Sequence, residues 1–331
     1  MVAGPPLALT MGEAAGIGPE IAAKAWRARL DAAVPPFVFI GDGAAIAAHD
    51  PDVAVREIDS LDHVHTTFAH ALPVLPVPLA APVEPGRLNP ANAPATIAAI
   101  DRAVDLARSG QVGGVVTNPI HKQALYEAGF TDPGHTEYLA RLCDLPADAA
   151  VMMLAIPGLR VVPATVHIPL ADVAARLSVD RLVHVASVTA SDLTARFGIA
   201  RPRLSVAGLN PHAGEAGNLG REEIEIIAPA VNAMRARGID VTGPLPADTL
   251  FHARARTGHD AVICMYHDQA LIPLKTLDFD HGVNVTLGLP IVRTSPDHGT
   301  ALDIAGRGAA NPASLIAALT LAHQLAADAG G

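Results

Sequence analysis

The chain has 331 residues, of which 50% are hydrophobic and 17% charged, so it can build a real core and about two domains are expected. The formal net charge is −10 and only 3% of the residues are aromatic, which argues against a general nucleic-acid surface or a base-stacking platform. No apolar run approaches the ~20 residues of a membrane span, and the N-terminus does not resemble a secretory signal. Cys143 and Cys264 both stand among apolar residues, which favours a reducing, cytoplasmic location.

Short apolar runs alternate with amphipathic segments, which is typical of an α/β fold with a largely parallel sheet. The first third predicts strands at 6–10 and 36–41 on either side of a helix at 18–30. A second helix is expected over about 97–107. The proline-rich segment 73–90 predicts an edge strand or an extended connector, because proline cannot donate to a central ladder.

The middle of the chain has a different pattern. Two apolar runs, 151–156 and 159–168, flank a Pro-Gly pair and predict two antiparallel strands. A strand at 203–210 and a helix at 221–238 should follow. The last helix is expected to open at Asn311 as its N-cap, with a proline in its first position.

Polar side chains gather where predicted strands end, and α/β proteins build their sites at such ends. His167, His212 and His267 each stand at or just beyond a strand end. Three neutral imidazoles with an open fourth position suit zinc or a similar divalent ion that acts as a Lewis acid. The chain has 15 histidines, and most histidines are ordinary surface or core residues, so the residues alone leave both interpretations open.

The segment GEAAGIGPE resembles a dinucleotide-binding turn only in part. After Gly16 and Gly18 the third glycine of the fingerprint would fall at Ile21, so the Rossmann pattern fails. We therefore expect a glycine-rich turn that starts a helix, whose backbone N–H groups could still approach a ligand.

Several polar residues interrupt apolar sequence and could bind an anion. Lys275 and Arg293 would be costly to bury without a counterion, so a ligand phosphate or carboxylate is one candidate partner and a nearby aspartate is the other. His135 and Thr136 precede a helix, where Thr136 could be a simple cap or the helix terminus could receive an anion. Asp248 is by default the cap of the helix that follows it.

Seven segments, taken together and in order, resemble the 4-hydroxythreonine-4-phosphate dehydrogenase family, and the resemblance runs from about residue 6 to 325. The last segment also looks like the nicotinamide-binding loop of isocitrate and isopropylmalate dehydrogenases, whose two-domain α/β/α fold has no Rossmann fingerprint. The segments are GEAAGIGPE, TNPIHKQAL, GHTEYLA, TVHIPL, GLNPHAGE with GREE, YHDQALIPLK and GVNVTLGLPIVRTSPDHGTALDIAGRG.

The resemblance implies a discontinuous α/β domain, 1–125 plus 285–331, that carries the cofactor loop. The second domain, 126–284, would carry the metal ligands and the dimer interface of a homodimer whose active sites are shared. The family oxidises the 3-hydroxyl of 4-phosphohydroxy-L-threonine with NAD, or NADP, and the 3-oxo acid then loses carbon dioxide to give 3-amino-2-oxopropyl phosphate. This reaction belongs to the route to pyridoxal phosphate.

The resemblance also assigns roles, residue by residue. The metal, which could be Zn, Co or Mg, would be bound by His167, His212 and His267, and the substrate by His135, Thr136, Lys275, Asn284 and Arg293. By analogy with the wider superfamily, the cofactor would lie against Gly299, Thr300, Asp303 and Asn311. The general base is not assigned, and its candidates are Asp248, Asp268 and Lys275.

This chain departs from the family pattern at three positions, with Ala14 for a frequent proline, Asn218 for a common histidine and Leu302 for the proline of the wider superfamily. The nearest alternative is a sister dehydrogenase for phosphorylated threonate or erythronate, or for a dihydrodiol dicarboxylate. A metal hydrolase and a phosphate acyltransferase are more distant alternatives.

Overall fold

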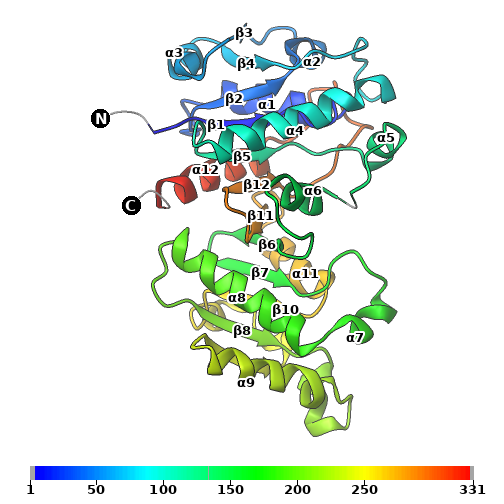
Figure 1. Cartoon of the computed structure of the whole chain (residues 1–331), viewed down its shortest axis with the longest axis vertical. Helices are drawn as coiled ribbons and strands as arrows, with labels where there is room; N and C mark the ends of the chain where they lie inside the picture. Colours follow the sequence, from blue (N-terminus) through cyan, green and yellow to red (C-terminus); the bar gives the residue numbers. More distant parts are fainter. Residues whose placement is uncertain (1–3, 133, 329–331) are drawn as a thin grey trace. The chain divides into compact units, whose positions relative to one another are not determined.

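The computed structural model describes residues 4–132 and 134–328. It divides into two compact units, Met1–Ala150 with Leu289–Gly331 (unit 1) and Val151–Gly288 (unit 2). Each unit is a sheet with helices packed on it (Figure 1), so the α/β class is confirmed. The expected boundaries were 1–125 with 285–331 and 126–284, whereas here residues 126–150 lie in unit 1 and residues 285–288 in unit 2. No helix of the described chain is long and apolar enough to span a membrane.

The sheet of unit 1 is entirely parallel, with the strand order β3-β4-β2-β1-β5-β12. Its central strands are buried along their whole length, as is normal where helices cover both faces of a parallel sheet. The strands are β1 (Leu7–Thr10), β2 (Phe37–Gly41), β3 (Val55–Glu57), β4 (Leu72–Pro76), β5 (Gly114–Thr117) and β12 (Arg293–Pro296).

The proline-rich segment 73–90 was expected to be an edge strand or an extended connector. Its first residues instead belong to β4, which lies between β3 and β2, whereas residues 77–89 belong to no strand, as expected of a connector. Pairing with β2 begins at Val74, after Pro73, and Pro76 is the last residue of the strand. On the β2 side both prolines therefore stand at the ends of the ladder, where a missing N–H costs little, although Pro73 lies opposite Arg56 in the pairing with β3.

The helices of unit 1 follow the predicted pattern. Pro19 lies in the first turn of α1, and the Asn311 Oδ1 atom accepts a hydrogen bond from the N–H of Ala313 at 3.0 Å, as expected of a cap. Helix α4 crosses the front of the sheet in Figure 1. The helices are α1 (Gly18–Arg27), α2 (Gly43–His49), α3 (Val64–Phe68), α4 (Ala93–Arg108), α5 (Lys122–Glu127), α6 (His135–Leu142) and α12 (Ala313–Asp328), with 3-10 turns η1 (Leu61–His63) and η2 (Pro90–Asn92).

The sheet of unit 2 is mixed, with the order β11-β6-β7-β10-β8-β9. Strand β6 is antiparallel to both of its neighbours, as predicted for the pair around the Pro-Gly turn, and the remaining pairs are parallel. The carboxyl ends of β7, β10 and β8 therefore meet at one edge of the sheet. The strands are β6 (Val151–Ile156), β7 (Leu159–Pro163), β8 (Arg203–Ala207), β9 (Asp240–Leu245), β10 (Ala261–Cys264) and β11 (Val283–Leu287).

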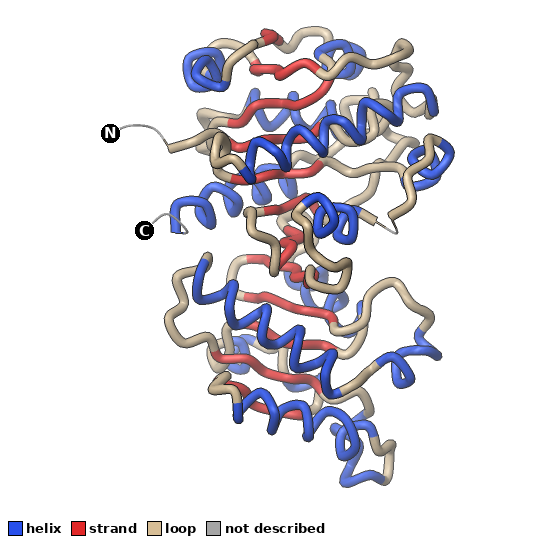
Figure 2. The backbone as a smooth tube through the Cα atoms, in the orientation of Figure 1, coloured by secondary structure: helices blue, strands red, loops and turns tan. Residues whose placement is uncertain are grey.

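Helices α8 and α9 pack together over this sheet (Figure 2), and α11 packs against β7. The helical segments are η3 (Leu170–Asp172), α7 (Val173–Arg176), α8 (Val179–Ala195), η4 (Pro211–Gly217), a π-helical turn η5 (Glu223–Ile227), α9 (Ala228–Ala236), η6 (Ala247–Thr249), α10 (Ala253–Arg256) and α11 (His267–Leu277).

Two capping predictions were wrong. Helix α6 begins at His135 with Gly134 as its N-cap, so Thr136 lies inside the first turn. Asp248 lies within the 3-10 turn η6, and α10 is capped by His252, whose ring accepts a hydrogen bond from Ala255 N–H. The caps lie two residues before Thr136 and four residues after Asp248, and helix ends are where sequence patterns are least informative.

Candidate functional site

Three neighbouring strand ends of unit 2 carry the predicted metal ligands. His167 follows β7, His267 follows β10, and His212 follows β8. The rings of His167 and His267 lie 5.6 Å apart between centroids, close enough for both imidazoles to reach a common ion. Both residues line a pocket of about 290 Å³, together with Tyr266 and Asp268.

His267 is oriented by its neighbour. Its Nδ1 atom lies 2.7 Å from Oδ1 of Asp268. A carboxylate paired with one ring nitrogen directs the other nitrogen outward and raises its basicity, which is the usual arrangement of a metal-binding histidine. The chemistry of this pair therefore fits a divalent ion.

His212 is not grouped with the other two histidines. In the described residues no three His, Cys, Asp or Glu side chains are close enough together to hold an ion. His212 is exposed and lies in a turn, residues 212–216, in which every residue has a positive φ. The structure thus brings two of the three predicted ligands together and places the third on the adjacent strand end. The turn that carries Asp248 lies beside the His212 turn.

Unit 1 holds a basic cluster that consists of the buried side chains of Arg293 and His135, with Lys122 near them. Arg293, at the start of β12, is 3% exposed and donates a hydrogen bond to Oγ1 of Thr117, the last residue of β5, at 2.5 Å. Burial lowers the pKa of Arg293 to about 10, so the guanidinium is still charged at neutral pH. His135 begins α6, and Thr136 is half-buried beside it.

The pKa of His135 lies well below its ordinary value, first because the ring is buried and then because Arg293 and Lys122 repel a further positive charge. Among the described residues the buried Nε2 atom of His135 has no hydrogen-bond partner. A phosphate or carboxylate beside this ring would be attracted by both cations. Lys122 was not predicted as a site residue, although it stands in the TNPIHKQAL segment.

Lys275 and Asn284 lie in unit 2. Lys275 is in the last turn of α11, with its Nζ atom 5.5 Å from the centroid of the Phe279 ring. Asn284 lies in β11, and its buried side-chain Oδ1 atom has no hydrogen-bond partner within the described part of the chain.

The predicted cofactor loop touches the glycine-rich turn of unit 1. The carbonyl of Thr300 accepts a hydrogen bond from the N–H of Ile17 at 2.9 Å. A Cβ atom at Gly16 would lie 3.0 Å from the Cβ and from the carbonyl oxygen of Thr300, so a side chain at this position would crowd the loop. Gly299 and Asp303 are exposed on the same loop.

Helix α1 fixes the far part of the loop. Glu20, which is 1% exposed, accepts hydrogen bonds from the N–H groups of Gly306 at 3.1 Å and Ala310 at 3.0 Å. Lys24 donates to the carbonyls of Gly308 at 2.8 Å and Ala310 at 2.6 Å. The loop is therefore held in one shape by two side chains of the helix that follows the glycine-rich turn.

Known proteins identify the family. A family model described as "Pyridoxal phosphate biosynthetic protein PdxA" matches residues 33–322. The 4-hydroxythreonine-4-phosphate dehydrogenase of Caulobacter vibrioides is 55% identical to this chain over 98% of each. The chain belongs to the PdxA family. The resemblance found in the sequence segments is thereby confirmed.

Solved structures agree with the PdxA assignment. The 4-hydroxythreonine-4-phosphate dehydrogenase from Klebsiella pneumoniae has a TM-score of 0.86 and 40% identity, over 97% of this chain and 99% of that one. A terephthalate 1,2-cis-dihydrodiol dehydrogenase from Burkholderia xenovorans has a TM-score of 0.65 and 32% identity, over 97% and 98%. Dehydrogenases with different substrates therefore share this fold, and the substrate must be inferred from the site residues.

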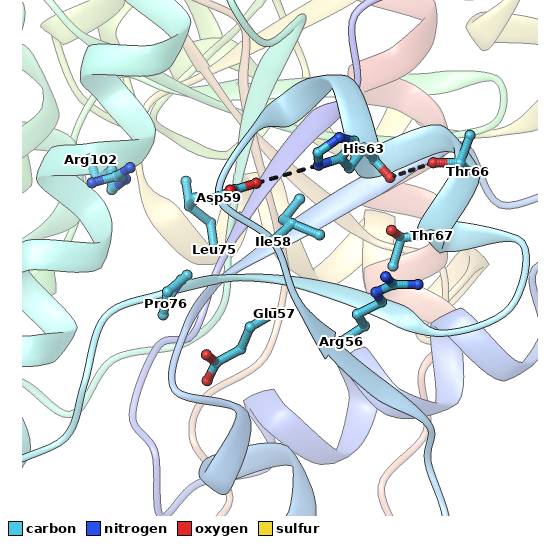
Figure 3. Close-up of a pocket in the computed structure, with 10 residues that line it drawn as sticks. All are labelled: Arg56, Glu57, Ile58, Asp59, His63, Thr66, Thr67, Leu75, Pro76 and Arg102. Atoms are coloured by element: carbon cyan, nitrogen blue, oxygen red, sulfur yellow. Dashed lines mark hydrogen bonds and ion pairs between the residues drawn. The ribbon is translucent and has the colours of Figure 1, made fainter.

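A larger pocket, of about 650 Å³, lies in unit 1 (Figure 3), and none of the described residues that line it is a predicted site residue. Its rim carries both signs of charge, with Arg56 and Arg102 against Glu57 and Asp59. The Nδ1 atom of His63 lies 3.4 Å from Oδ1 of Asp59. These opposite charges can neutralise one another, so the pocket has no net charge that would attract an anionic substrate. Its larger volume is therefore not a reason to regard it as the active site.

Proposed function

We propose that the protein oxidises the 3-hydroxyl group of 4-phosphohydroxy-L-threonine with NAD and that the product is decarboxylated to 3-amino-2-oxopropyl phosphate, in pyridoxal phosphate biosynthesis. The observation that carries this proposal is the 55% identity over 98% of the chain to a 4-hydroxythreonine-4-phosphate dehydrogenase. A hydride acceptor is needed to balance the oxidation, and NAD, or NADP, takes that role.

The substrate phosphate would be bound by the basic cluster of unit 1 together with Thr136. Arg293 supplies a permanent charge, His135 a buried ring nitrogen, and Thr136 an N–H in the first turn of α6. Lys275 and Asn284 of unit 2 are the further substrate residues. Binding energy from the non-reacting phosphate positions the carbon that loses hydride, so a defect here lowers turnover as well as binding.

His167 and His267, with His212 as the third ligand, would bind one divalent ion, which could be Zn, Co or Mg. When bound, the ion supplies Lewis-acid chemistry to the substrate oxygen. Asp268 holds the His267 ring through the 2.7 Å contact to Nδ1, which favours an orienting role for Asp268. Asp248 and Lys275 are then the candidates for the base that takes the hydroxyl proton.

Gly299, Thr300, Asp303 and Asn311 would lie along the cofactor, on the loop that α1 holds through Glu20 and Lys24. The sequence has Ile21 where the Rossmann fingerprint needs glycine, which agrees with a cofactor that is bound by this loop and not by the glycine-rich turn.

We also propose a cytoplasmic homodimer with shared sites. Ile272 in α11 is 63% exposed, and Phe279 just beyond it is 74% exposed. Large apolar side chains so exposed beside Lys275 are suited to contact with a second subunit. Both cysteines are buried among apolar residues, which supports a reducing compartment.

The decisive assay measures NADH formation from 4-phosphohydroxy-L-threonine, phosphothreonate, phosphoerythronate and a dihydrodiol dicarboxylate, each with and without a chelator. We expect NADH from the first substrate and its loss with the chelator. The 32% identity to a dihydrodiol dehydrogenase makes that activity the second candidate. Turnover of another substrate without any from 4-phosphohydroxy-L-threonine would refute the assignment.

A further inference from the structure

Gln269, in the first turn of α11, connects two of the strand ends that carry the predicted metal ligands. Its Oε1 atom accepts a hydrogen bond from the N–H of Met265 at 2.6 Å, and its Nε2 atom donates to the carbonyl of Gly208 at 2.8 Å. Met265 follows β10 and precedes His267 by two residues. Gly208 follows β8 and precedes His212 by four. One amide side chain therefore ties the His267 strand end to the His212 strand end.

The third strand end is joined to the same point. Thr165, two residues before His167, donates from Oγ1 to the carbonyl of Met265 at 2.7 Å. Met265 is thus held on its N–H by Gln269 and on its carbonyl by Thr165. Since β7, β10 and β8 lie side by side (Figure 1), these contacts lock all three ends in register.

The His212 turn needs such support because its backbone is unfavourable. Four of its residues are not glycine and have positive φ, a conformation that L-residues avoid. Glu223, which is 3% exposed, accepts hydrogen bonds from the N–H groups of Leu209 at 2.7 Å and Asn210 at 2.8 Å. Gln269 holds Gly208, the residue immediately before. Together these side chains fix the base of the turn.

We propose that Gln269 is a positioning residue that sets the His212 turn relative to the His167–His267 pair. This inference rests on the proposed function, in which the three histidines bind one ion. The primary amide is the required group because it accepts from Met265 and donates to Gly208 at the same time. An ionised carboxylate can only accept, and an apolar side chain of the same size can do neither.

The test compares Gln269→Leu, which has similar volume and no polar group, with Gln269→Glu, which keeps the acceptor and loses the donor. Gln324→Leu, on an exposed position of α12, is the matched control. Affinity for Co²⁺ and Zn²⁺ is measured by calorimetry without substrate or NAD. The visible spectrum of the Co²⁺ form and the unfolding temperature of the metal-free protein complete the data.

We expect the affinity to fall about 10-fold or more in Gln269→Leu, in the range known for partners of metal ligands, with an altered Co²⁺ spectrum. Gln269→Glu should lie between Gln269→Leu and wild type, and it decides the question should Gln269→Leu fail to fold. A lower unfolding temperature with unchanged metal affinity and an unchanged Co²⁺ spectrum would overturn this inference and leave the proposed function standing. A wild-type protein that forms NADH but binds neither ion would overturn it together with the metal part of the proposed function.

Discussion

The guanidinium of Arg293 and the hydroxyl of Thr117 join the first residue of β12 to the last residue of β5 by a 2.5 Å hydrogen bond inside the core of unit 1. This bond orients a buried cation, and the same cation helps to keep the neighbouring His135 ring neutral. A fixed charge with little water around it attracts an anion more strongly than a surface arginine does.

We therefore predict that Arg293→Met lowers kcat/KM for the phosphorylated substrate by about 100-fold or more, because a charged hydrogen bond in such a site contributes roughly 1.5–3 kcal/mol and the reacting carbon also loses its positioning. Steady-state kinetics with varied substrate at saturating NAD measure the effect. Arg102→Met, an exposed arginine of α4, is the control and should leave kcat/KM unchanged. A loss of less than threefold in Arg293→Met would remove Arg293 from the substrate site.

Thr117→Val should have a smaller effect of the same kind. The variant keeps the shape of the side chain and removes the acceptor of the Arg293 hydrogen bond, so the guanidinium loses its orientation but not its charge. We expect KM for the substrate to rise several-fold with little change in the KM for NAD. Equal changes in both constants would indicate general damage to unit 1.

The neutral state of His135 predicts a stability that depends on pH. Its pKa is lowered in the folded state, so between that value and the ordinary value near 6.5 the unfolded chain binds more protons, and stability falls as the pH falls through this window. One such group contributes at most about 1.4 kcal/mol per pH unit. Urea unfolding at pH 7.5 and 5.5 should show a smaller pH difference for His135→Asn than for wild type. His70→Asn, an exposed histidine, should show the wild-type difference.

The sequence was informative where a local pattern determines the structure. The strand ends that carry His167, His212 and His267 could be predicted because parallel strands end at the same edge of a sheet. The antiparallel pair could be predicted because two short apolar runs flank a Pro-Gly turn. Proline content misled at β4, because the ladder with β2 depends on where Pro73 and Pro76 stand and not on the number of prolines.

The supporting side chains could not be predicted. Glu20 accepts from backbone N–H groups 286 and 290 residues away, and Gln269 donates to a carbonyl 61 residues away. Such bonds follow no spacing, because any long polar side chain can reach a backbone group once the fold has brought it near. Lys122 was missed for a related reason, since a lysine beside a helix start is usually exposed to solvent.

Glu20 leads to a prediction about the cofactor. Glu20→Gln weakens the acceptor of two loop N–H groups without changing the size of the side chain, so residues 306–310 should become less ordered. We expect the KM for NAD to rise about 10-fold, as for other residues that hold a site through its neighbours, with the KM for substrate nearly unchanged. The control is Arg27→Ala, which lies on the same helix as Glu20 and breaks an exposed ion pair with Asp50 at the end of α2. Equal effects of both variants would argue against a cofactor role for this loop.

Asp268 was a candidate for the base, and its contact with His267 gives a way to decide. If Asp268 orients the ring, Asp268→Asn weakens the binding of Co²⁺ or Zn²⁺ by about 10-fold while kcat at saturating ion stays close to wild type. If it is the base, kcat falls at least 100-fold even at saturating ion, because no carboxylate is left to take the proton. We expect the first result, since Oδ1 is already engaged by Nδ1 at 2.7 Å. Asp180→Asn, at the exposed start of α8, controls for the loss of one negative charge in unit 2.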